Sequence, residues 1–223
     1  MERQRETDWR GCGLTLAILA VNIIAYIVCT QTGEVVYNIG SMNAGKILDE
    51  KQYYRFVTCI FLHADIDHIV SNMIYLAGLG QMIEPLIGHI RFGMLYLLSG
   101  LCGSVFSFLF SVLSGDMYDA VGASGAIFGL IGALFILVAA RDMRRRSRVQ
   151  RGCQDGMPGE SGGEPASPYE RISVGKLVFV VAYMIYSGAR SARVDNAAHV
   201  GGLVCGLLVM AVMNLVKTGG YRG

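Results

Sequence analysis

Long apolar stretches separated by shorter polar segments run through most of the chain. Several of these stretches approach the roughly 20 residues that a helix needs to cross the hydrocarbon core of a bilayer. A lone helix satisfies its own backbone hydrogen bonds in lipid, so a helical bundle is the expected architecture. The pattern predicts an all-α membrane protein, a bundle of six transmembrane helices. The predicted spans cover residues 12–31, 56–83, 92–113, 120–140, 172–188 and 196–216.

The composition agrees with a membrane protein. Of the 223 residues, 53% are hydrophobic, 16% are charged and 29 are glycine, whereas soluble domains of this length carry more charge and fewer glycines. Six cysteines are present, but none forms a C-x-x-C pair. We therefore expect neither a disulfide framework nor a zinc site. No cofactor and no metal are predicted.

The distribution of basic residues predicts the orientation in the membrane. Cytoplasmic loops of membrane proteins are enriched in Lys and Arg. If the N-terminus is cytoplasmic, most of the 19 Lys and Arg residues fall on the cytoplasmic side. Both termini are therefore predicted to be cytoplasmic. The expected divisions are an N-terminal segment over 1–11, a six-helix domain over 12–217 and a tail over 218–223.

Two connections between the spans are long. The segment between the first and second spans is moderately apolar, so we expect an interfacial loop made of short amphipathic pieces. Residues 141–171, between the fourth and fifth spans, are rich in Arg, Gly, Pro and Ser, which predicts a mobile cytoplasmic linker. Its arginines are attributed to topology and to contact with anionic lipid, not to nucleic-acid binding.

Polar side chains inside three spans are candidates for function, because burying such groups in a membrane is costly. The second span carries His68 and Asn72, which are four residues apart and so share one helical face. The fourth span begins near Ser124, and the sixth carries His199. In the predicted topology these three spans all enter from the outer side. The four residues are therefore expected at a similar shallow depth, where they can meet in one place.

Small residues indicate that the fourth and sixth spans pack closely, since stripes of glycine let helix backbones approach in lipid. Close packing would bring the Ser124 hydroxyl within hydrogen-bond reach of His199, and a neighbouring base is what activates a serine. Free amide groups in the first turn of the fourth span would suit a developing oxyanion. The small residues are Gly125 and Gly129 in the fourth span and Gly202 and Gly206 in the sixth.

Three short motifs contain these polar residues. They are H-x4-H-x3-N at His63, His68 and Asn72, G-x-S-G at 122–125, and A-H-x-G-G at 198–202. The motifs, their order along the chain and the spans they occupy resemble the rhomboid family of intramembrane serine proteases. Arg55 in Y-Y-R-F and Glu84 at the inner end of the second span are similar to further family positions, although Tyr54 replaces the usual Trp.

The resemblance implies a role for each motif residue. Ser124 would be the nucleophile and His199 the general base, a dyad without an acid member. The oxyanion hole would consist of His68, Asn72 and the Ser124 backbone N–H. Phe128 would stack on the His199 ring, where many relatives have Tyr. The remaining supporting residues would be Gly122, Gly125, His63 and Gly202.

The resemblance also implies the substrate and the location. Substrates would be single-pass transmembrane proteins that enter sideways from the lipid bilayer and are cut near the outer end of the transmembrane segment. The active site would open to the extracytoplasmic side of a plasma membrane. The short chain, without an extra helix or organelle targeting, favours a bacterial membrane and the minimal six-helix form. The oligomeric state is left open.

Three other functions compete with this hypothesis. A transporter or channel should show internal repeats and polar residues that continue to the inner side, and the sequence shows neither. A relative that binds membrane clients without cutting them would lack the serine or the histidine, and both are present. A zinc site formed by His63, His68 and His199 would need a special geometry, because these residues lie at different azimuths.

Overall fold

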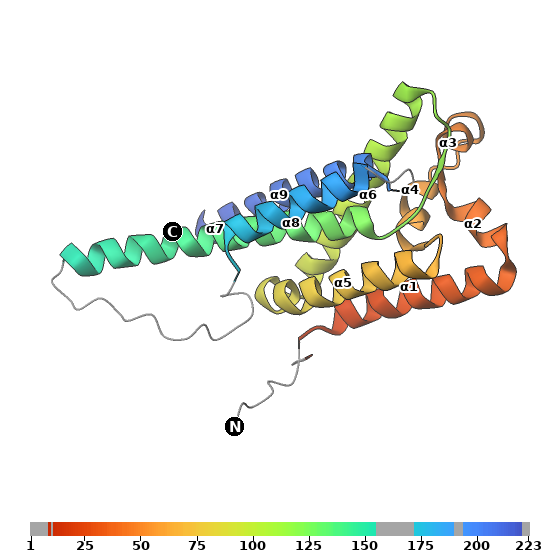
Figure 1. Ribbon diagram of the computed structural model, residues 1–223. Helices are drawn as coiled ribbons and strands as arrows, with labels where there is room; N and C mark the ends of the chain where they lie inside the picture. The colour runs from red at the N-terminus through yellow and green to blue at the C-terminus, as the bar shows by residue number, and fades with distance from the viewer. Residues whose placement is uncertain (1–8, 10, 155–171, 190–193, 220–223) are drawn as a thin grey trace.

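The computed structural model describes residues 9, 11–154, 172–189 and 194–219, and most of them are helical (Figure 1). Most of the predicted N-terminal segment and the last residues of the predicted tail lie outside this part of the chain. The long helices are α1 (Gly13–Thr32), α5 (Ile66–Ile87), α6 (His89–Ser114), α7 (Ser124–Gln154), α8 (Val174–Ala189) and α9 (Asn196–Gly219). The short elements are α2 (Glu34–Gly40), β1 (Met42–Asn43), α3 (Ala44–Glu50), α4 (Arg55–Thr58), η1 (Cys59–Phe61) and β2 (Asp119–Ala120).

Four helical segments in the described residues are long and apolar enough to cross a membrane. α5 has the length of a span but is interrupted by polar residues such as Asp67, Asn72 and Glu84. α8 contains a shorter apolar helix. Length and composition therefore support four of the six predicted spans, and membrane crossing by α5 and α8 stays a prediction. The four segments are Gly13–Thr32, His89–Ser114, Ser124–Ser147 and Asn196–Leu215.

Two predicted spans begin too early. The pattern predicts one helix over residues 56–83, but the chain forms α4 and η1 and then breaks before α5 starts at Ile66. Asp65 fixes this start, because its carboxylate accepts the backbone N–H of His68 at 2.8 Å, as an N-cap residue does. The span predicted from residue 120 begins instead at Ser124, since the preceding residues form β2 and a turn.

The helix α7 continues past the predicted start of the linker at residue 141. It remains helical to Gln154, well beyond its apolar part (Figure 1). Arginine is a good helix former, so the loss of hydrophobicity does not end the helix. At this point Arg141 donates to the carboxylate of Asp142 at 2.8 Å and to the carbonyl of Ile172, next to α8, at 2.6 Å. The rest of the predicted linker, residues 155–171, lies outside the described part.

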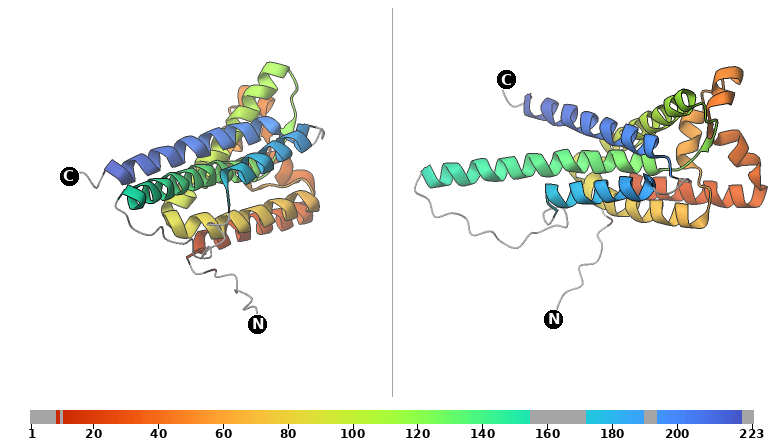
Figure 2. Two further views of the ribbon diagram at one scale, coloured as in Figure 1. Left: turned by 60° about the vertical axis from the view of Figure 1, so that its left-hand side comes forward. Right: turned by 45° about the horizontal axis from the view of Figure 1, so that its top comes forward.

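The helices α6, α7 and α9 form the tightly packed centre of the bundle. In the right-hand view of Figure 2, α7 lies between α8 and α9. A Cβ atom on Gly202 would overlap the carbonyl oxygen of Gly125, and one on Gly206 would overlap that of Gly129. The backbones of α7 and α9 are therefore in direct contact, which only glycine permits at these two positions. α6 also packs closely against α9, since a Cβ on Gly103 of α6 would lie 2.9 Å from the carbonyl oxygen of Ala198.

The long helices alternate in direction. α1, α6 and α8 run one way, and α5, α7 and α9 run the other, so the first residues of α5, α7 and α9 lie at the same end of the molecule (Figure 1). The start of α1 and the end of α9 lie at the opposite end. The polar residues near the starts of α5, α7 and α9 therefore lie at the same end of the bundle.

The segment between α1 and α5 is anchored by Arg55, whose side chain is buried. Its guanidinium donates to the carbonyl oxygens of Ser41 at 2.7 Å and Asn38 at 3.0 Å. This anchor holds β1 in place, and β1 pairs with β2 in antiparallel register, Met42 opposite Ala120. The segment is therefore attached to the residues just ahead of Ser124.

At the other end of the molecule, Glu84 connects α5 to α1. Its carboxylate accepts the backbone N–H groups of Leu14 and Thr15, both at 2.8 Å, and also the Thr15 hydroxyl. The exposed ring of His89 forms a further contact with it. The first amides of a helix have no acceptor within the helix, so Glu84 caps the first turn of α1.

Candidate active site

The start of α7 meets α5 through Gly122 and His68. Gly122 has φ +132, a conformation that side chains rarely allow. A Cβ atom at this position would lie 2.7 Å from Nε2 of His68 and 3.7 Å from Oγ of Ser124. The imidazole of His68 and the hydroxyl of Ser124 therefore lie beside the same point. Any residue larger than glycine would fill the space between them.

His199 reaches the same helix one turn further along. Its ring stacks on that of Phe128, with the centroids 4.1 Å apart and an interplanar angle of 11°. Phe128 lies four residues after Ser124, so the stack places the imidazole against the first turns of α7. Among the hydrogen bonds of the described residues, none joins the Ser124 hydroxyl to the His199 ring. The dyad itself therefore remains a prediction.

Several buried polar atoms at this end have no protein partner within the described residues. They belong to the ring of His63 (Nδ1 and Nε2), to Asn72 (Nδ2) and to His199 (Nδ1). The His63 ring lies against that of His68 at 5.1 Å, in an edge-to-face arrangement. A buried polar group without a partner is costly, so such groups are rare except where they serve a reaction or a ligand. Atoms of Asn22, Tyr96 and Ser99 share this property elsewhere in the bundle, but the group near Ser124 is the one that coincides with the sequence motifs, which makes this end a candidate functional site.

The backbone at the start of α7 adds electrostatic potential to the site. The first intrahelical bond of this region is donated by Ile127 to the carbonyl of Ala123. The amides that precede it, including that of Ser124, have no acceptor within the helix. Together with the helix dipole they give a positive potential beside the Ser124 hydroxyl. Such a site can stabilise an oxyanion.

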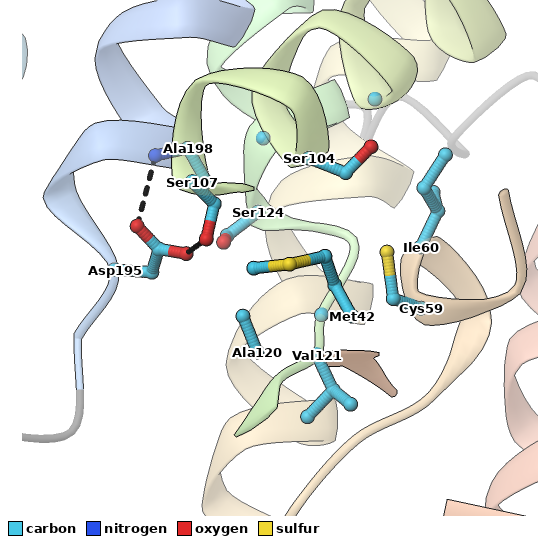
Figure 3. Close-up of a pocket in the computed structure, with 13 residues that line it drawn as sticks. Met42, Cys59, Ile60, Ser104, Ser107, Ala120, Val121, Ser124, Asp195 and Ala198 are labelled. Carbon is cyan, nitrogen blue, oxygen red and sulfur yellow. Dashed lines mark hydrogen bonds between the residues drawn. The ribbon is translucent and has the colours of Figure 1, made fainter. Parts of the chain in front are cut away.

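A pocket opens beside Ser124 (Figure 3). α6 contributes Ser104 and Ser107 to its wall, α9 and the residue just ahead of it contribute Ala198 and Asp195, and β1 contributes Met42. Of these, only Ala198 falls within a motif recognised in the sequence. Burial raises the pKa of the Tyr118 hydroxyl, and the charge of nearby Asp195 raises it further. The phenol 3.4 Å from the Ser107 hydroxyl therefore stays neutral.

Sequence reasoning missed Asp195 and Ser107. Asp195 could have been found, because an Asp just ahead of a predicted helix is a common N-cap residue. Ser107 gives no such signal, since a serine inside an apolar run is ordinary in a membrane helix. Only the structure shows that the Ser107 hydroxyl bonds to Asp195, just ahead of α9.

Comparison with known proteins identifies the family. The family model of the Rhomboid domain matches residues 50–215, about three quarters of the chain, and this range contains every site residue named above except Met42. The chain belongs to the rhomboid family.

Curated relatives give the same result. Over 176 residues the chain is 30% identical to rhomboid protease GluP of Bacillus subtilis (strain 168), covering 78% of this chain and 29% of the relative. It is 32% identical to RHOMBOID-like protein 2 of Arabidopsis thaliana over 175 residues, covering 78% of this chain and 47% of the relative. RHOMBOID-like protein 7 of the same plant is 43% identical over 98 residues, covering 43% of this chain and 29% of the relative. The matches thus span less than half of each of these relatives.

Membership of the rhomboid family, together with the four long apolar helices, makes this a multi-pass membrane protein. The zinc alternative requires His63, His68 and His199 to converge on one point. Within the described residues, no group of three or more His, Cys, Asp or Glu side chains is arranged to hold a metal ion.

Proposed function

We propose that this rhomboid protein is an intramembrane serine endopeptidase with Ser124 as nucleophile and His199 as general base. The observation that carries the proposal is the convergence of three helix starts on Ser124. His68 and Ser124 flank Gly122, and the His199 ring is stacked on Phe128 one turn below Ser124. Nucleophile, base and oxyanion donors are the components that acyl transfer needs.

The reaction would proceed in two steps. His199 accepts the proton of the Ser124 hydroxyl while Oγ attacks the carbonyl carbon of the scissile bond. The resulting oxyanion is stabilised by the Ser124 N–H and by donors from His68 and Asn72. The protonated His199 then gives its proton to the leaving amine, and an acyl-enzyme remains. Water, activated by the same histidine, hydrolyses the ester and restores the serine.

The unpartnered atoms of the site support these assignments. Asn72 is almost fully buried and its Nδ2 has no partner in the described residues. No protein group competes for this donor, so we propose that it is kept for the oxyanion that forms during the reaction. An interaction made only in the transition state lowers the barrier directly.

The substrate we propose is the transmembrane segment of a single-pass membrane protein, cut near its outer end. The site lies where α5, α7 and α9 begin, close to the end of the bundle and not at its middle. We propose that this end is extracytoplasmic, that all six long helices cross the membrane and that both termini are cytoplasmic. The basic residues after the apolar part of α7 favour this orientation.

The relatives also bear on the kind of membrane. A bacterial plasma membrane fits the match to GluP of Bacillus subtilis. Other relatives are plant proteins, and one of these is named mitochondrial. The oligomeric state is open.

A cleavage assay tests the proposal. The purified protein in liposomes is incubated with a single-pass model substrate that has small residues and a helix-breaking residue near the outer end of its transmembrane segment. The wild type should release a soluble fragment, and Ser124→Ala should not. A chelator should leave the rate unchanged. Capture of the substrate without cleavage by the wild type would favour the client-binding alternative.

A further inference from the structure

Asp195 lies immediately ahead of α9 and makes the bonds of an N-cap residue. Its Oδ1 accepts the backbone N–H of Ala198 at 2.9 Å, and its carbonyl oxygen accepts that of His199 at 3.2 Å. The first turn of α9, which carries the His199 ring, is therefore bonded directly to Asp195. Residues in a first turn without a cap fray readily, because their amides then have no acceptor.

The second carboxylate oxygen of Asp195 forms a hydrogen bond with a residue of α6. Oδ2 accepts the hydroxyl proton of Ser107, which is almost fully buried in α6 (Figure 3). Both side chains line the pocket beside Ser124. One oxygen of the Asp195 carboxylate thus caps the first turn of α9, and the other connects that turn to α6. A cap that served α9 alone would not need the second bond.

The buried His199 ring makes no hydrogen bond within the described residues. Its Nδ1 has no partner in the described residues, and its face rests on Phe128. A stack fixes the plane of the ring but allows it to slide within that plane. The position of the ring along α7 therefore depends on the position of the first turn of α9. A displacement of about 1 Å at a catalytic group can reduce a rate by about 10²-fold.

The geometry points to Asp195 as a positioning residue that holds His199 in register with Ser124 by clamping the first turn of α9 to Ser107. The inference rests on the proposed function, since it assigns a role toward the proposed base. Asp195 acts through the backbone of α9 and does not itself exchange a proton with the substrate.

Three variants separate this role from general helix stability. Asp195→Ala removes both bonds, and Ser107→Ala removes only the bond to α6. Asp195→Asn keeps both, because its amide oxygen can accept the Ala198 N–H while its NH₂ group donates to the Ser107 oxygen. The matched control is Ser173→Ala, which removes a longer cap contact to Lys176 at the start of α8.

The test measures kcat and KM for a transmembrane substrate, with thermal unfolding in parallel. Asp195→Ala should lower kcat by about 10- to 100-fold with KM unchanged. Ser107→Ala should lower it less, and Asp195→Asn should restore it to near the wild-type value. Ser173→Ala should leave kcat unchanged even where it lowers the unfolding temperature.

Two results would overturn the inference while leaving the proposed function intact. One is a wild-type kcat in a folded Asp195→Ala or, should that variant not fold, in Ser107→Ala. The other is an Asp195→Asn variant as slow as Asp195→Ala, which would show that the charge and not the clamp matters. If the folded wild type neither cleaves the substrate nor reacts with a fluorophosphonate serine probe at Ser124, the proposed function fails first, and the inference fails with it.

Discussion

The two ends of the bundle treat buried polar groups in opposite ways. At one end the carboxylate of Glu84 is fully buried and is met by two backbone amides, a hydroxyl and an imidazole. At the other end Asn72, His63 and His199 are equally buried, but atoms of each have no partner in the described residues. Satisfied polar groups stabilise a membrane protein, whereas unsatisfied ones reduce its stability. At the first end a satisfied carboxylate joins two helices, and in our proposal the second end keeps unpaired polar atoms for chemistry.

The largest effect should come from the proposed dyad. Ser124→Ala and His199→Ala should each lower the cleavage rate by about 10⁴-fold or more, because neither residue works without the other. The unfolding temperature of Ser124→Ala should stay at the wild-type value, since its hydroxyl makes no structural bond in the described residues. Cleavage rate and thermal unfolding are measured on the same preparation. Full activity in His199→Ala would exclude it as the base.

Asn72→Ala should have the next largest effect. Loss of one oxyanion donor lowers kcat by about 10²–10³-fold, and removing a buried unpaired amide should not lower stability. The matched control is Asn22→Ala in α1, where the amide donates to the carbonyl of Ile18 at 2.8 Å. That variant should lose stability and keep its kcat. Equal kcat values for the two variants would remove Asn72 from the site.

Glu84→Ala should have the opposite effect to Asn72→Ala, lowering stability and leaving kcat unchanged. The change leaves the amides of Leu14 and Thr15 unpaired in a buried place, which should cost about 2–4 kcal/mol of unfolding free energy. The kcat of the protein that remains folded should be unchanged, since Glu84 lies at the far end from Ser124. Denaturant unfolding and active-site titration separate the two quantities. A lower kcat at full stability would mean that the two ends are coupled.

His89→Ala should give the smallest effect. Its side chain is 59% exposed, and ion pairs of exposed side chains contribute at most about 1 kcal/mol. Glu84 keeps its three bonds to α1 in this variant, so stability should fall only slightly. A loss as large as that of Glu84→Ala would show that the imidazole, and not the first turn of α1, is the main partner of the carboxylate.

The sequence predicted well those features that depend on local spacing. Ser124 and Phe128 lie one turn apart on α7, and His68 and Asn72 one turn apart on α5, because a helix fixes such spacings. The contact between α7 and α9 could be expected for a similar reason. Glycines at i and i+4 on each helix have few other uses in lipid than close packing.

Contacts between residues far apart in the chain could not be predicted from the sequence. The hydrogen bond from Ser107 to Asp195 and the strand pairing of Met42 with Ala120 each join two segments that no local sequence pattern relates. The break before α5 was missed because residues 56–65 are as apolar as a span. The extension of α7 was missed because hydrophobicity reports on membrane crossing and not on where a helix ends.

The most direct test of the account asks whether Ser124 is activated, and it needs no substrate. The protein, purified in mild detergent, is treated with a fluorophosphonate probe, and the adduct is mapped by mass spectrometry. The account predicts labelling at Ser124 that disappears in His199→Ala and persists in Glu84→Gln. Absence of labelling in folded wild-type protein, or equal labelling in His199→Ala, would contradict it.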